Sequence, residues 1–389
     1  MDLPRLLERA VAVGASDVHL KVGSPPRVRR EGRLEPLEGA DRVTEEDVAV
    51  VLEEVCGASP ARRAAFERDG ELDIAYAGAG SRFRVNGYRQ RGTSAFVFRR
   101  IPGEPPTFAD LCLPAGVRRL AETHHGLTLV TGPTGSGKST TLASMINHIN
   151  CTRASHIVTI EDPIEILHRD ASSSVSQREV GLDTASFSEA LRRALRQDPD
   201  VILIGEMRDI GAAETALRAA ESGHLVLSTL HTVSAAETIS RVVDLFPAVK
   251  QAQVRAILAG VLRGVVSQRL LPRLDGGVVA AVEVMIVNAR IAELIRENKP
   301  EEITDAIAEG AYFDMQTFER ALVELVLDGA VGRDVAANAA MNHHDFLVTL
   351  ERELKAKAAR EKASEEDTPT EEEPEPLAPL STAPRLSPR

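Results

Sequence analysis

Residues 132–139 form a complete phosphate-binding loop of the pattern G-x-x-x-x-G-K-[ST]. An apolar, β-prone run at 126–131 precedes the loop, and a helical pattern at 140–149 follows it. A strand that leads through a glycine-rich turn into a helix points backbone N–H groups and the positive end of the helix dipole at one anion. Lys138 can then reach the β- and γ-phosphates of a nucleotide, and the Ser139 hydroxyl can bind Mg²⁺. The candidate nucleotide-binding residues here are Gly132, Pro133, Thr134, Gly135, Ser136, Gly137, Lys138, Ser139 and Thr140.

An acidic residue follows the apolar run 201–205, which is typical of a buried parallel strand. Glu206 is therefore placed to organise Mg²⁺ or its waters, and it is our candidate for the general base that polarises the attacking water. A positioned base contributes about 10²- to 10⁴-fold to a rate. The alternative is an acid that caps the next helix, which the pattern predicts at 209–220.

A second apolar run, 157–160, ends in the carboxylates of Glu161 and Asp162, and Pro163 terminates the strand. Glu161 is the better candidate for positioning water or binding Mg²⁺, and Glu165 is the weaker one. Taken alone, such a motif is more often a strand end followed by a solvated turn, so this alternative stays open.

Two histidines, His224 and His231, bracket a third apolar strand. Their odd spacing puts them on opposite faces of a strand, which argues against a shared metal site. His231, at the carboxyl end, is our candidate sensor of the γ-phosphate, because an imidazole can report a phosphate through one hydrogen bond. His224 is kept as a candidate nucleotide-binding residue, with a structural or subunit-contact role as the alternative.

Phosphoryl transfer also needs positive charge against the developing negative charge, often from an arginine of a neighbouring subunit. The strands predicted between 81 and 101 are rich in arginine, and composition cannot choose among them. The candidates are Arg82, Arg84, Arg89, Arg91, Arg99 and Arg100.

The chain that must position these side chains has 389 residues, which favours two domains. Hydrophobic residues make up 43%, but there are 10 Phe, 3 Tyr and no Trp, so the cores must be aliphatic. No apolar run approaches the length of a membrane span, and the N-terminus lacks the pattern of a signal peptide, so we expect a cytoplasmic protein. The widely separated Cys56, Cys112 and Cys151 exclude a local cysteine-based zinc knuckle and argue against a disulfide framework.

The net charge of −12 comes largely from the C-terminus, where seven acidic residues and no basic one lie between 365 and 375. The remainder is nearly balanced, which gives no reason to expect direct nucleic-acid binding. Residues 358–389, rich in Pro, Glu, Ser and Thr, are predicted to form a disordered tail.

Residues 1–101 are predicted to form a small α+β domain, and the Pro-rich residues 102–110 a linker. Residues 111–357 show strands alternating with helices, which predicts an α/β fold with a mainly parallel sheet and functional groups at the carboxyl ends of its strands. The elements expected in the first domain are helices 3–13 and 44–56 and strands 16–21, 71–77, 81–90 and 94–101. In the second they are strands 127–131, 156–161, 201–205 and 224–230, followed by helices 253–267, 289–297, 303–308, 315–327 and 343–357.

Taken together, these motifs resemble those of the secretion ATPase superfamily, the motors of type II secretion and type IV pili. The order and spacing of that family's motifs are matched by this chain. They are Walker A at 132–139, the Asp box at 157–165, Walker B at 202–206 and the His box at 223–231.

Within the superfamily, the chain is most similar to the type IV pilus retraction ATPases. Its N-terminal part begins at once with S-D-V-H-L at 16–20, residues 289–297 resemble the family's AIRxLIRE helix, and 314–318 resemble its GMQT segment. Three features depart from the family: Thr232-Val233-Ser234 after the His box, Arg290-Ile291-Ala292 within the helix motif, and the acidic tail.

The resemblance implies a PAS-like N-terminal domain, a RecA-like P-loop ATPase motor domain with a helical C-terminal part, and a homohexameric ring with ATP sites between subunits. It implies ATP and Mg²⁺ as cofactors, an inner-membrane platform protein as partner, and a place at the cytoplasmic face of the inner membrane. Among the arginines it favours Arg84 and Arg99 as catalytic groups, and Arg208 matches a further position of the family's nucleotide site.

Three alternatives stay open beside a motor for pilus retraction. The chain could be an assembly or type II secretion ATPase with a minimal N-terminus. It could be a DNA-transfer ATPase, although the scarcity of aromatic residues argues against base stacking in a nucleic-acid channel. It could also be a nucleotide switch that does not hydrolyse ATP.

Overall fold

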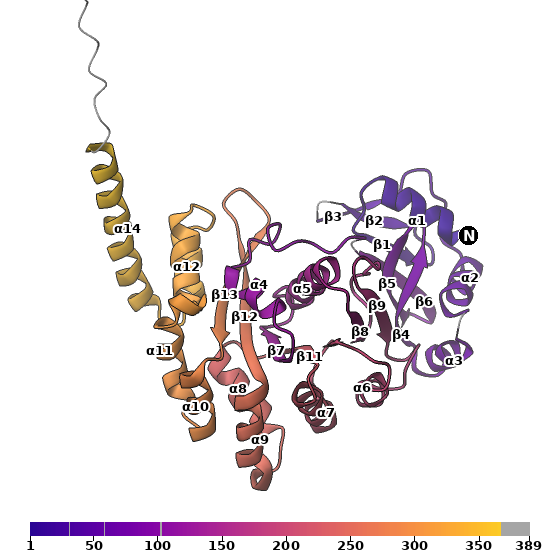
Figure 1. Ribbon diagram of the computed structural model, residues 1–389. Helices are drawn as coiled ribbons and strands as arrows, with labels where there is room; N and C mark the ends of the chain where they lie inside the picture. Colours follow the sequence, from indigo (N-terminus) through magenta and orange to yellow (C-terminus); the bar gives the residue numbers. More distant parts are fainter. Residues whose placement is uncertain (31, 58, 102, 367–389) are drawn as a thin grey trace, which may run out of the picture.

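The computed structural model of the chain describes residues 1–30, 32–57, 59–101 and 103–366. Two β-sheets organise it, with the N-terminal sheet at one side and the C-terminal helices at the other (Figure 1). The α/β fold expected for residues 111–357 and the α+β pattern expected for the first hundred residues are both confirmed. Of the predicted linker, Pro102 lies outside the described residues.

The first sheet is antiparallel, with the strand order β3-β2-β1-β6-β5-β4. All four strands predicted in this region are present, while β2 and β3 are not anticipated by the sequence pattern because they are short and rich in arginine. The strands are β1 (Asp17–Lys21), β2 (Arg27–Arg30), β3 (Arg33–Pro36), β4 (Glu71–Gly78), β5 (Ser81–Gln90) and β6 (Thr93–Ile101).

Three helices pack on this sheet: α1 (Leu3–Ala12), α2 (Glu45–Cys56) and α3 (Pro60–Asp69). The N-terminus of α2 is fixed by a capping box, in which Thr44 Oγ1 accepts from the Asp47 N–H and the Asp47 carboxylate accepts from the Thr44 N–H. Helix α3 is not predicted by the sequence pattern, because its only buried hydrophobic residue is Phe66.

The two faces of this sheet differ in chemistry. On β5, Phe83 and Val85 are buried in the core shared with the helices. Because strand side chains alternate between faces, Arg82 and Arg84 project from the opposite face. The first sheet therefore presents arginines on the side that its helices leave uncovered.

The second sheet has the order β13-β12-β7-β11-β10-β8-β9, in which all neighbours are parallel except β12 and β13. The four predicted strands lie together in its middle, and β9, β12 and β13 are additional to them. The strands are β7 (Gly126–Thr131), β8 (His156–Glu161), β9 (Ser174–Glu179), β10 (Val201–Ile204), β11 (Leu225–Leu230), β12 (Leu262–Pro272) and β13 (Val278–Ile286).

Helices cover both faces of this sheet, so the side chains of β7, β10 and β11 are buried along the whole length of each strand. Helices α4 (Ala115–Ala121) and α5 (Lys138–Thr152) lie on one face. On the other face lie α6 (Phe187–Ala194), α7 (Ile210–Glu221), α8 (Ala235–Asp244) and α9 (Ala248–Val261).

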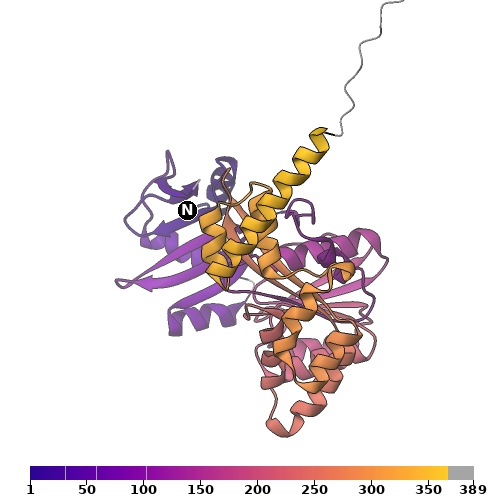
Figure 2. The same ribbon diagram turned by 90° about the vertical axis from the view of Figure 1, so that its left-hand side faces the viewer.

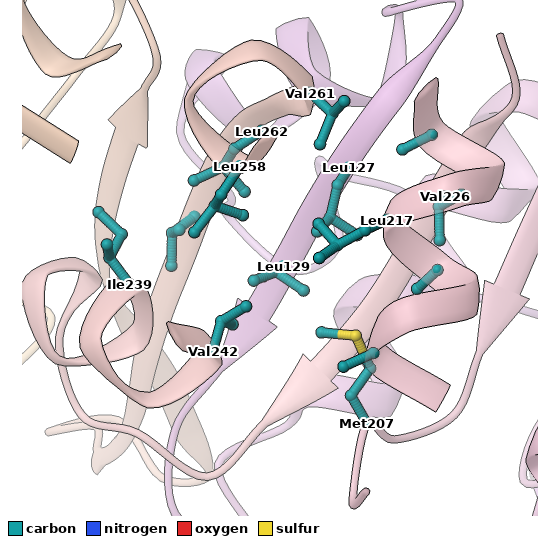
Figure 3. Packing of buried hydrophobic residues seen from close by; sticks show 14 of the residues in the cluster. Leu127, Leu129, Met207, Leu217, Val226, Ile239, Val242, Leu258, Val261 and Leu262 are labelled. Carbon is teal, nitrogen blue, oxygen red and sulfur yellow. The ribbon is translucent and has the colours of Figure 1, made fainter. Parts of the chain in front are cut away.

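Figure 3 shows part of the larger core, in which Leu127 and Leu129 of β7 lie among Leu217 of α7, Val242 of α8 and Leu258 of α9. Each of these side chains is at most 5% exposed, and full burial of such a side chain stabilises the fold by about 1.5–3 kcal/mol. This aliphatic core holds β7, and therefore the start of the phosphate loop, in a fixed position.

The helix predicted at 253–267 is wrong in its second half. Helix α9 ends at Val261, and β12 begins at Leu262 and pairs in parallel with β7. Gly264 permits the close approach of β12 to β13, its partner on the other side, because a Cβ atom there would lie 2.4 Å from the Met285 carbonyl oxygen. A continuous apolar run cannot by itself distinguish a buried helix from a buried strand, and the vacant place beside β7 decides the outcome here.

The C-terminal part is helical, as expected (Figure 2). The predicted helix 315–327 begins only at Phe318, because Thr317 is its N-cap. The tail predicted from residue 358 is wrong at its start, since α14 runs to Glu366; the remainder, 367–389, lies outside the described residues. The helices are α10 (Ala289–Glu297), α11 (Ile303–Ala308), α12 (Phe318–Leu327), α13 (Arg333–Ala339) and α14 (His343–Glu366).

No helix in the described part of the chain is both long and apolar enough to span a membrane.

Candidate active site

The phosphate loop leaves the carboxyl end of β7 and enters α5 at Lys138. Its glycines are required by the backbone: Gly132 has φ +145° and Gly137 has φ +86°. A Cβ atom on Gly132 would lie 2.3 Å from the carbonyl oxygen of Gln268, so β12 packs directly against the loop. The predicted strand–loop–helix order is confirmed, with α5 longer than the sequence pattern indicates.

The loop carries donors that are arranged for an anion. Lys138 is 9% exposed, and its Nζ donates to the carbonyl oxygens of Gly132 at 2.9 Å and Pro133 at 3.0 Å. Burial lowers the pKa of Lys138, while the carboxylates of Glu206 and Glu165 act in the opposite direction. Among the described residues the buried Ser136 hydroxyl has no hydrogen-bond partner. The oxygens of a phosphate would accept hydrogen bonds from both the Lys138 ammonium and the Ser136 hydroxyl.

Glu206 lies just beyond β10 and is held by two neighbours. Its Oε2 accepts from Arg208 Nε at 2.7 Å, and its Oε1 lies 3.1 Å from His231 Nε2. His231 Nδ1 is in turn 3.5 Å from Lys138 Nζ. Because Lys138 can only donate, this chain of contacts fits a neutral His231 that donates from Nε2 to Glu206.

The alternative structural role for Glu206 is contradicted. Asp209, and not Glu206, caps α7, since its carboxylate accepts from the Ala212 N–H at 2.8 Å. Glu206 thus remains 20% exposed beside the phosphate loop with no capping function.

Glu161 ends the neighbouring strand β8. Its Oε1 accepts from Thr159 Oγ1 at 2.6 Å and from Gln177 Nε2 at 3.1 Å. Burial raises the pKa of Glu161, and these hydrogen bonds partly oppose the rise. Glu165 lies four residues further on, half exposed, and its carboxylate approaches Arg84 at 3.7 Å.

Two arginines of the first sheet face each other across β5 and β6, where Arg84 and Arg99 are register partners. Like charges directly opposite each other are destabilising, so each needs an anionic partner. Arg84 forms a two-pronged ion pair with Asp73, at 2.6 and 3.1 Å, and Arg99 donates to the buried Asp17 at 2.9 Å.

Burial would raise the pKa of Asp17, but hydrogen bonds from Arg99 and Ser16 and the charge of Arg99 outweigh it and lower the pKa.

One cleft between the two sheets collects nearly all of the predicted site residues. Arg84 and Arg99 form its wall on the side of the first sheet, and the phosphate loop forms the opposite wall. Gly132, Pro133 and Ser136 belong to the loop but do not line the cleft. The predicted residues that line it are Arg84, Arg99, Thr134, Gly135, Gly137, Lys138, Ser139, Thr140, Glu161, Glu165, Glu206, Arg208 and His231.

His224 does not join this group. It lies at the amino end of β11, and its Nδ1 contacts Ser222 Oγ and the Ala219 carbonyl oxygen, both at 3.0 Å. His231 follows the carboxyl end of the same strand, so the two histidines lie at opposite edges of the sheet. This position favours the alternative for His224, a structural or subunit-contact role, over nucleotide binding.

The cleft takes both of its arginines from the same chain as its phosphate loop. Arg84 and Arg99 line the cleft of their own chain, because the arginine face of the first sheet turns toward the second sheet. A single chain therefore brings together the phosphate loop, Glu206 and both arginines.

Mg²⁺ fits this arrangement. Ser139, Glu161 and Glu206 all line the cleft beside the phosphate loop. Among the described residues no group of three or more His, Cys, Asp or Glu side chains could hold an ion alone. Mg²⁺ usually takes one or two protein ligands and completes its shell with phosphates and water, and the Ser139 hydroxyl and a carboxylate beside it are ligands of that type.

The sequence pattern does not reveal a second, more apolar pocket on the other side of the phosphate loop. Leu111, Cys112 and Leu113 contribute to it from the segment between the sheets, and Leu270 and Val278 from β12 and β13. Thr140 and Thr141 of α5 complete its wall, so this pocket begins where the phosphate loop ends.

Gln268 is a further residue that the sequence pattern misses. Its Nε2 donates to the carbonyl oxygen of Ser136 at 2.6 Å and so supports the phosphate loop from β12. It could have been found only by predicting β12 as the strand beside β7, which the apolar pattern at 262–267 did not indicate.

Comparison with known proteins agrees with this geometry. Residues 113–367 match the family described as "Type II/IV secretion system protein". Over 352 residues the chain is 45% identical to the type IV pilus retractation ATPase PilT of Pseudomonas aeruginosa, covering 89% of this chain and 100% of that protein. It is also 46% identical over 283 residues to the twitching motility protein of Neisseria gonorrhoeae, covering 72% of this chain and 76% of that protein.

A crystal structure of the pilus retraction motor PilT with bound ADP is similar throughout, with a TM-score of 0.82 and 45% identity, covering 88% of this chain and 98% of that chain. The chain therefore belongs to the Type II/IV secretion system protein family and is a PilT-type ATPase.

Proposed function

We propose that the chain is a Mg²⁺-dependent ATPase motor that drives type IV pilus retraction. The observation that carries this proposal is the single cleft that combines the phosphate loop, Glu206, His231 and two arginines. The 45% identity to PilT over that protein's whole length supports retraction as the work performed.

In the proposed site, the phosphate loop and Lys138 bind the β- and γ-phosphates, and the Ser139 hydroxyl and Glu161 hold Mg²⁺ or its waters. Bound Mg²⁺ would neutralise developing charge on the phosphate oxygens. The apolar pocket beside Thr140 and Thr141 has the character of a site for the nucleotide base, since it adjoins the phosphate loop and is lined by Leu111, Leu113 and Leu270.

Glu206 would accept the proton of the attacking water. Both of its carboxylate oxygens are engaged, one by Arg208 and the other by His231. A general base must reach the water that it deprotonates with an oxygen that is free to accept its hydrogen bond. We therefore infer that hydrolysis begins when the γ-phosphate draws His231 or Arg208 away and frees one oxygen of Glu206.

Arg84 and Arg99 would stabilise the charge that develops on the transferred phosphoryl group. Each is now paired with an acid of its own sheet. Closing the cleft would exchange these partners for phosphate oxygens, and this exchange couples the nucleotide state to a movement of one sheet against the other.

We further propose that the chain works as a homohexamer at the cytoplasmic face of the inner membrane and acts on a platform protein of the pilus machinery, without direct contact to nucleic acid. Residues 1–101 and 111–357 would be its two moving domains. PAS-like and RecA-like domain architectures are proposed for them on the basis of the family resemblance.

The test is a count of surface pili in the native host after replacement of the gene by a Glu206→Gln allele, beside a deletion. Gln keeps the shape of Glu206 but cannot accept the proton, so turnover of the purified variant should fall about 10²- to 10⁴-fold while ATP still binds. We expect more pili and no twitching in both strains. Bald cells would indicate an assembly motor instead, and unchanged pili would point to secretion or DNA transfer.

A further inference from the structure

A buried charged cluster joins the two sheets beside the cleft. Glu179, the last residue of β9, is 1% exposed. Its Oε1 lies 3.2 Å from Arg62 Nη2 on α3, and its Oε2 lies 2.8 Å from Arg82 Nη2 on β5. Both arginine side chains are also largely buried, at 15% and 17% exposure. We call Arg62, Arg82 and Glu179 the joint triad.

Stability alone does not explain a buried triad of this kind. Removing three charges from water costs more than packing apolar side chains of similar volume, so such clusters add little net stability. What they do fix is geometry, because a guanidinium binds a carboxylate in a defined orientation. β9 is the edge strand of the second sheet, and the joint triad ties it to two elements of the N-terminal part, α3 and β5.

The joint triad is connected to both walls of the cleft. Arg82 and Arg84 are two residues apart on β5 and so project from the same face of the strand. On the other wall, Glu179 Oε2 also accepts from the Ile164 N–H at 3.4 Å. Ile164 lies three residues after Glu161, so one carboxylate contacts both the strand of Arg84 and the loop that follows Glu161.

The contacts outside the joint triad are weaker. The ion pair between Arg84 and Glu165 also crosses the cleft, but its atoms are 3.7 Å apart and both side chains are more than 40% exposed. Exposed pairs contribute about 0–1 kcal/mol and do not fix a geometry. Glu179 is therefore the best-defined polar connection between the arginine strand and the second sheet.

We propose that Glu179 is a positioning residue for ATP hydrolysis: by holding Arg82 and Arg62 it sets the orientation in which Arg84 and Arg99 meet the bound nucleotide. This inference rests on the function proposed above for those two arginines. Charged donors accelerate a reaction only when they are held close to the productive geometry, and a misplacement of about 1 Å can cost about 10²-fold in rate.

The test is Glu179→Gln in the full-length chain. Gln preserves the shape of the side chain but removes its charge and leaves one oxygen for two arginines. We expect kcat for ATP to fall by about 10- to 100-fold, because the arginine strand loses its fixed position. The affinity for ADP, measured by calorimetry, should change by less than about twofold, because the phosphate loop is untouched.

The matched control is Glu67→Gln. Glu67 pairs at 3.0 Å with Arg63, the neighbour of Arg62 on α3. The side chains of Glu67 and Arg63 are both about half exposed, so this pair is not part of a buried cluster. This variant should retain the wild-type kcat. If it slows hydrolysis as much as Glu179→Gln does, removal of any acidic partner from the arginines of α3 is sufficient to slow the reaction, and the proposal is overturned.

A second variant separates positioning from simple destabilisation. Replacing the whole joint triad with apolar residues, as Arg62→Met, Arg82→Met and Glu179→Leu together, leaves no uncompensated charge and can keep the elements packed. We expect this variant to fold, as judged by its thermal midpoint, but to keep kcat as low as in Glu179→Gln, because apolar side chains lack the defined orientation of a guanidinium on a carboxylate.

Three results would overturn the proposal: wild-type kcat in Glu179→Gln, loss of ADP binding together with kcat, or a folded triple variant that recovers the wild-type kcat. If the wild-type chain itself does not hydrolyse ATP, the proposed function fails instead, and the two failures are thereby distinguished.

Discussion

At the scale of single residues, chemistry and geometry agree closely around the phosphate loop. Lys138, His231 and Glu206 lie in one chain of contacts: Lys138 Nζ is 3.5 Å from His231 Nδ1, and His231 Nε2 is 3.1 Å from Glu206 Oε1. The loop needs glycine where φ is positive, and the sequence has glycine at those positions. His224 shows the limit of such inference, because a histidine near a motif is not necessarily near its site.

Cys112 offers a probe of the apolar pocket beside the phosphate loop. If the nucleotide base binds there, ATP at ten times its Kd should slow alkylation of Cys112 by N-ethylmaleimide about tenfold, since only about a tenth of the sites remain open. Cys151, exposed at the end of α5, is the internal control and should react at an unchanged rate. Peptide mass spectrometry distinguishes the two thiols, and equal rates for Cys112 with and without ATP would exclude the base from this pocket.

His168 predicts a pH dependence of stability. Burial lowers the pKa of His168 from 6.5 to about 4. Between these values the unfolded chain binds a proton on this side chain and the folded chain does not. The free energy of unfolding should therefore decrease as the pH falls from 6.5 to 4, by up to about 3 kcal/mol.

The measurement is the urea midpoint across this pH range, for the wild type and for His168→Gln. The variant should lose this part of the pH dependence, whereas His343→Gln, which alters an exposed residue at the start of α14, should keep it. An identical slope in wild type and His168→Gln would contradict the assignment.

At the scale of elements, the transition from α9 to β12 decides how the phosphate loop is supported. The chain changes from helix to strand between Val261 and Leu262, and Gln268 on the strand then reaches the loop. The local sequence is compatible with either element, and pairing with β7 selects the strand. Secondary structure at this point is thus a consequence of tertiary packing.

Two glycines on either side of this transition test it. Gly264→Ala should destabilise the fold by about 1–3 kcal/mol, because its Cβ atom would lie 2.4 Å from the Met285 carbonyl oxygen and 2.6 Å from Leu120. Gly260→Ala, in α9 with open space around the added atom, should stabilise the fold by about 0.5–1 kcal/mol. Thermal midpoints that shift in the same direction for both variants would contradict this account.

At the scale of the whole molecule, one chain supplies both walls of the cleft. If the arginine came from a neighbouring subunit, the active site of each separate chain would lack it. Here Arg84 and Arg99 line the same cleft as the phosphate loop of their own chain. A mixing experiment distinguishes the two arrangements in solution.

The experiment combines an Arg84→Ala, Arg99→Ala chain with a Glu206→Gln chain. If the arginines act in their own chain, each mixed site still lacks one necessary group, so the ATPase rate of the mixture stays at the sum of its parts. Arginines acting between subunits would restore a fraction of the sites and raise the rate several-fold over that sum. Refolding or subunit exchange must be verified by native mass spectrometry of the mixed assemblies.

Much of this protein is determined by its sequence alone. The phosphate loop is recognisable by itself, because a glycine-rich turn between a strand and a helix has few other uses. Glu206, Glu161 and His231 become candidates because each follows a predicted strand, and the carboxyl ends of such strands gather at one edge of the sheet. Caps such as Thr44 and Asp209 likewise define their helices from neighbouring residues alone. These features depend on local backbone chemistry, which a linear pattern preserves.

Only the tertiary structure decides which chain elements meet. It pairs β12 with β7, turns the arginine face of the first sheet toward the phosphate loop, and buries Glu179 between Arg62 and Arg82. Glu179 is separated from these arginines by 117 and 97 residues. Contacts of this kind depend on the packing of whole sheets, and neither the hydrophobic period nor the motif spacing of one segment contains that information.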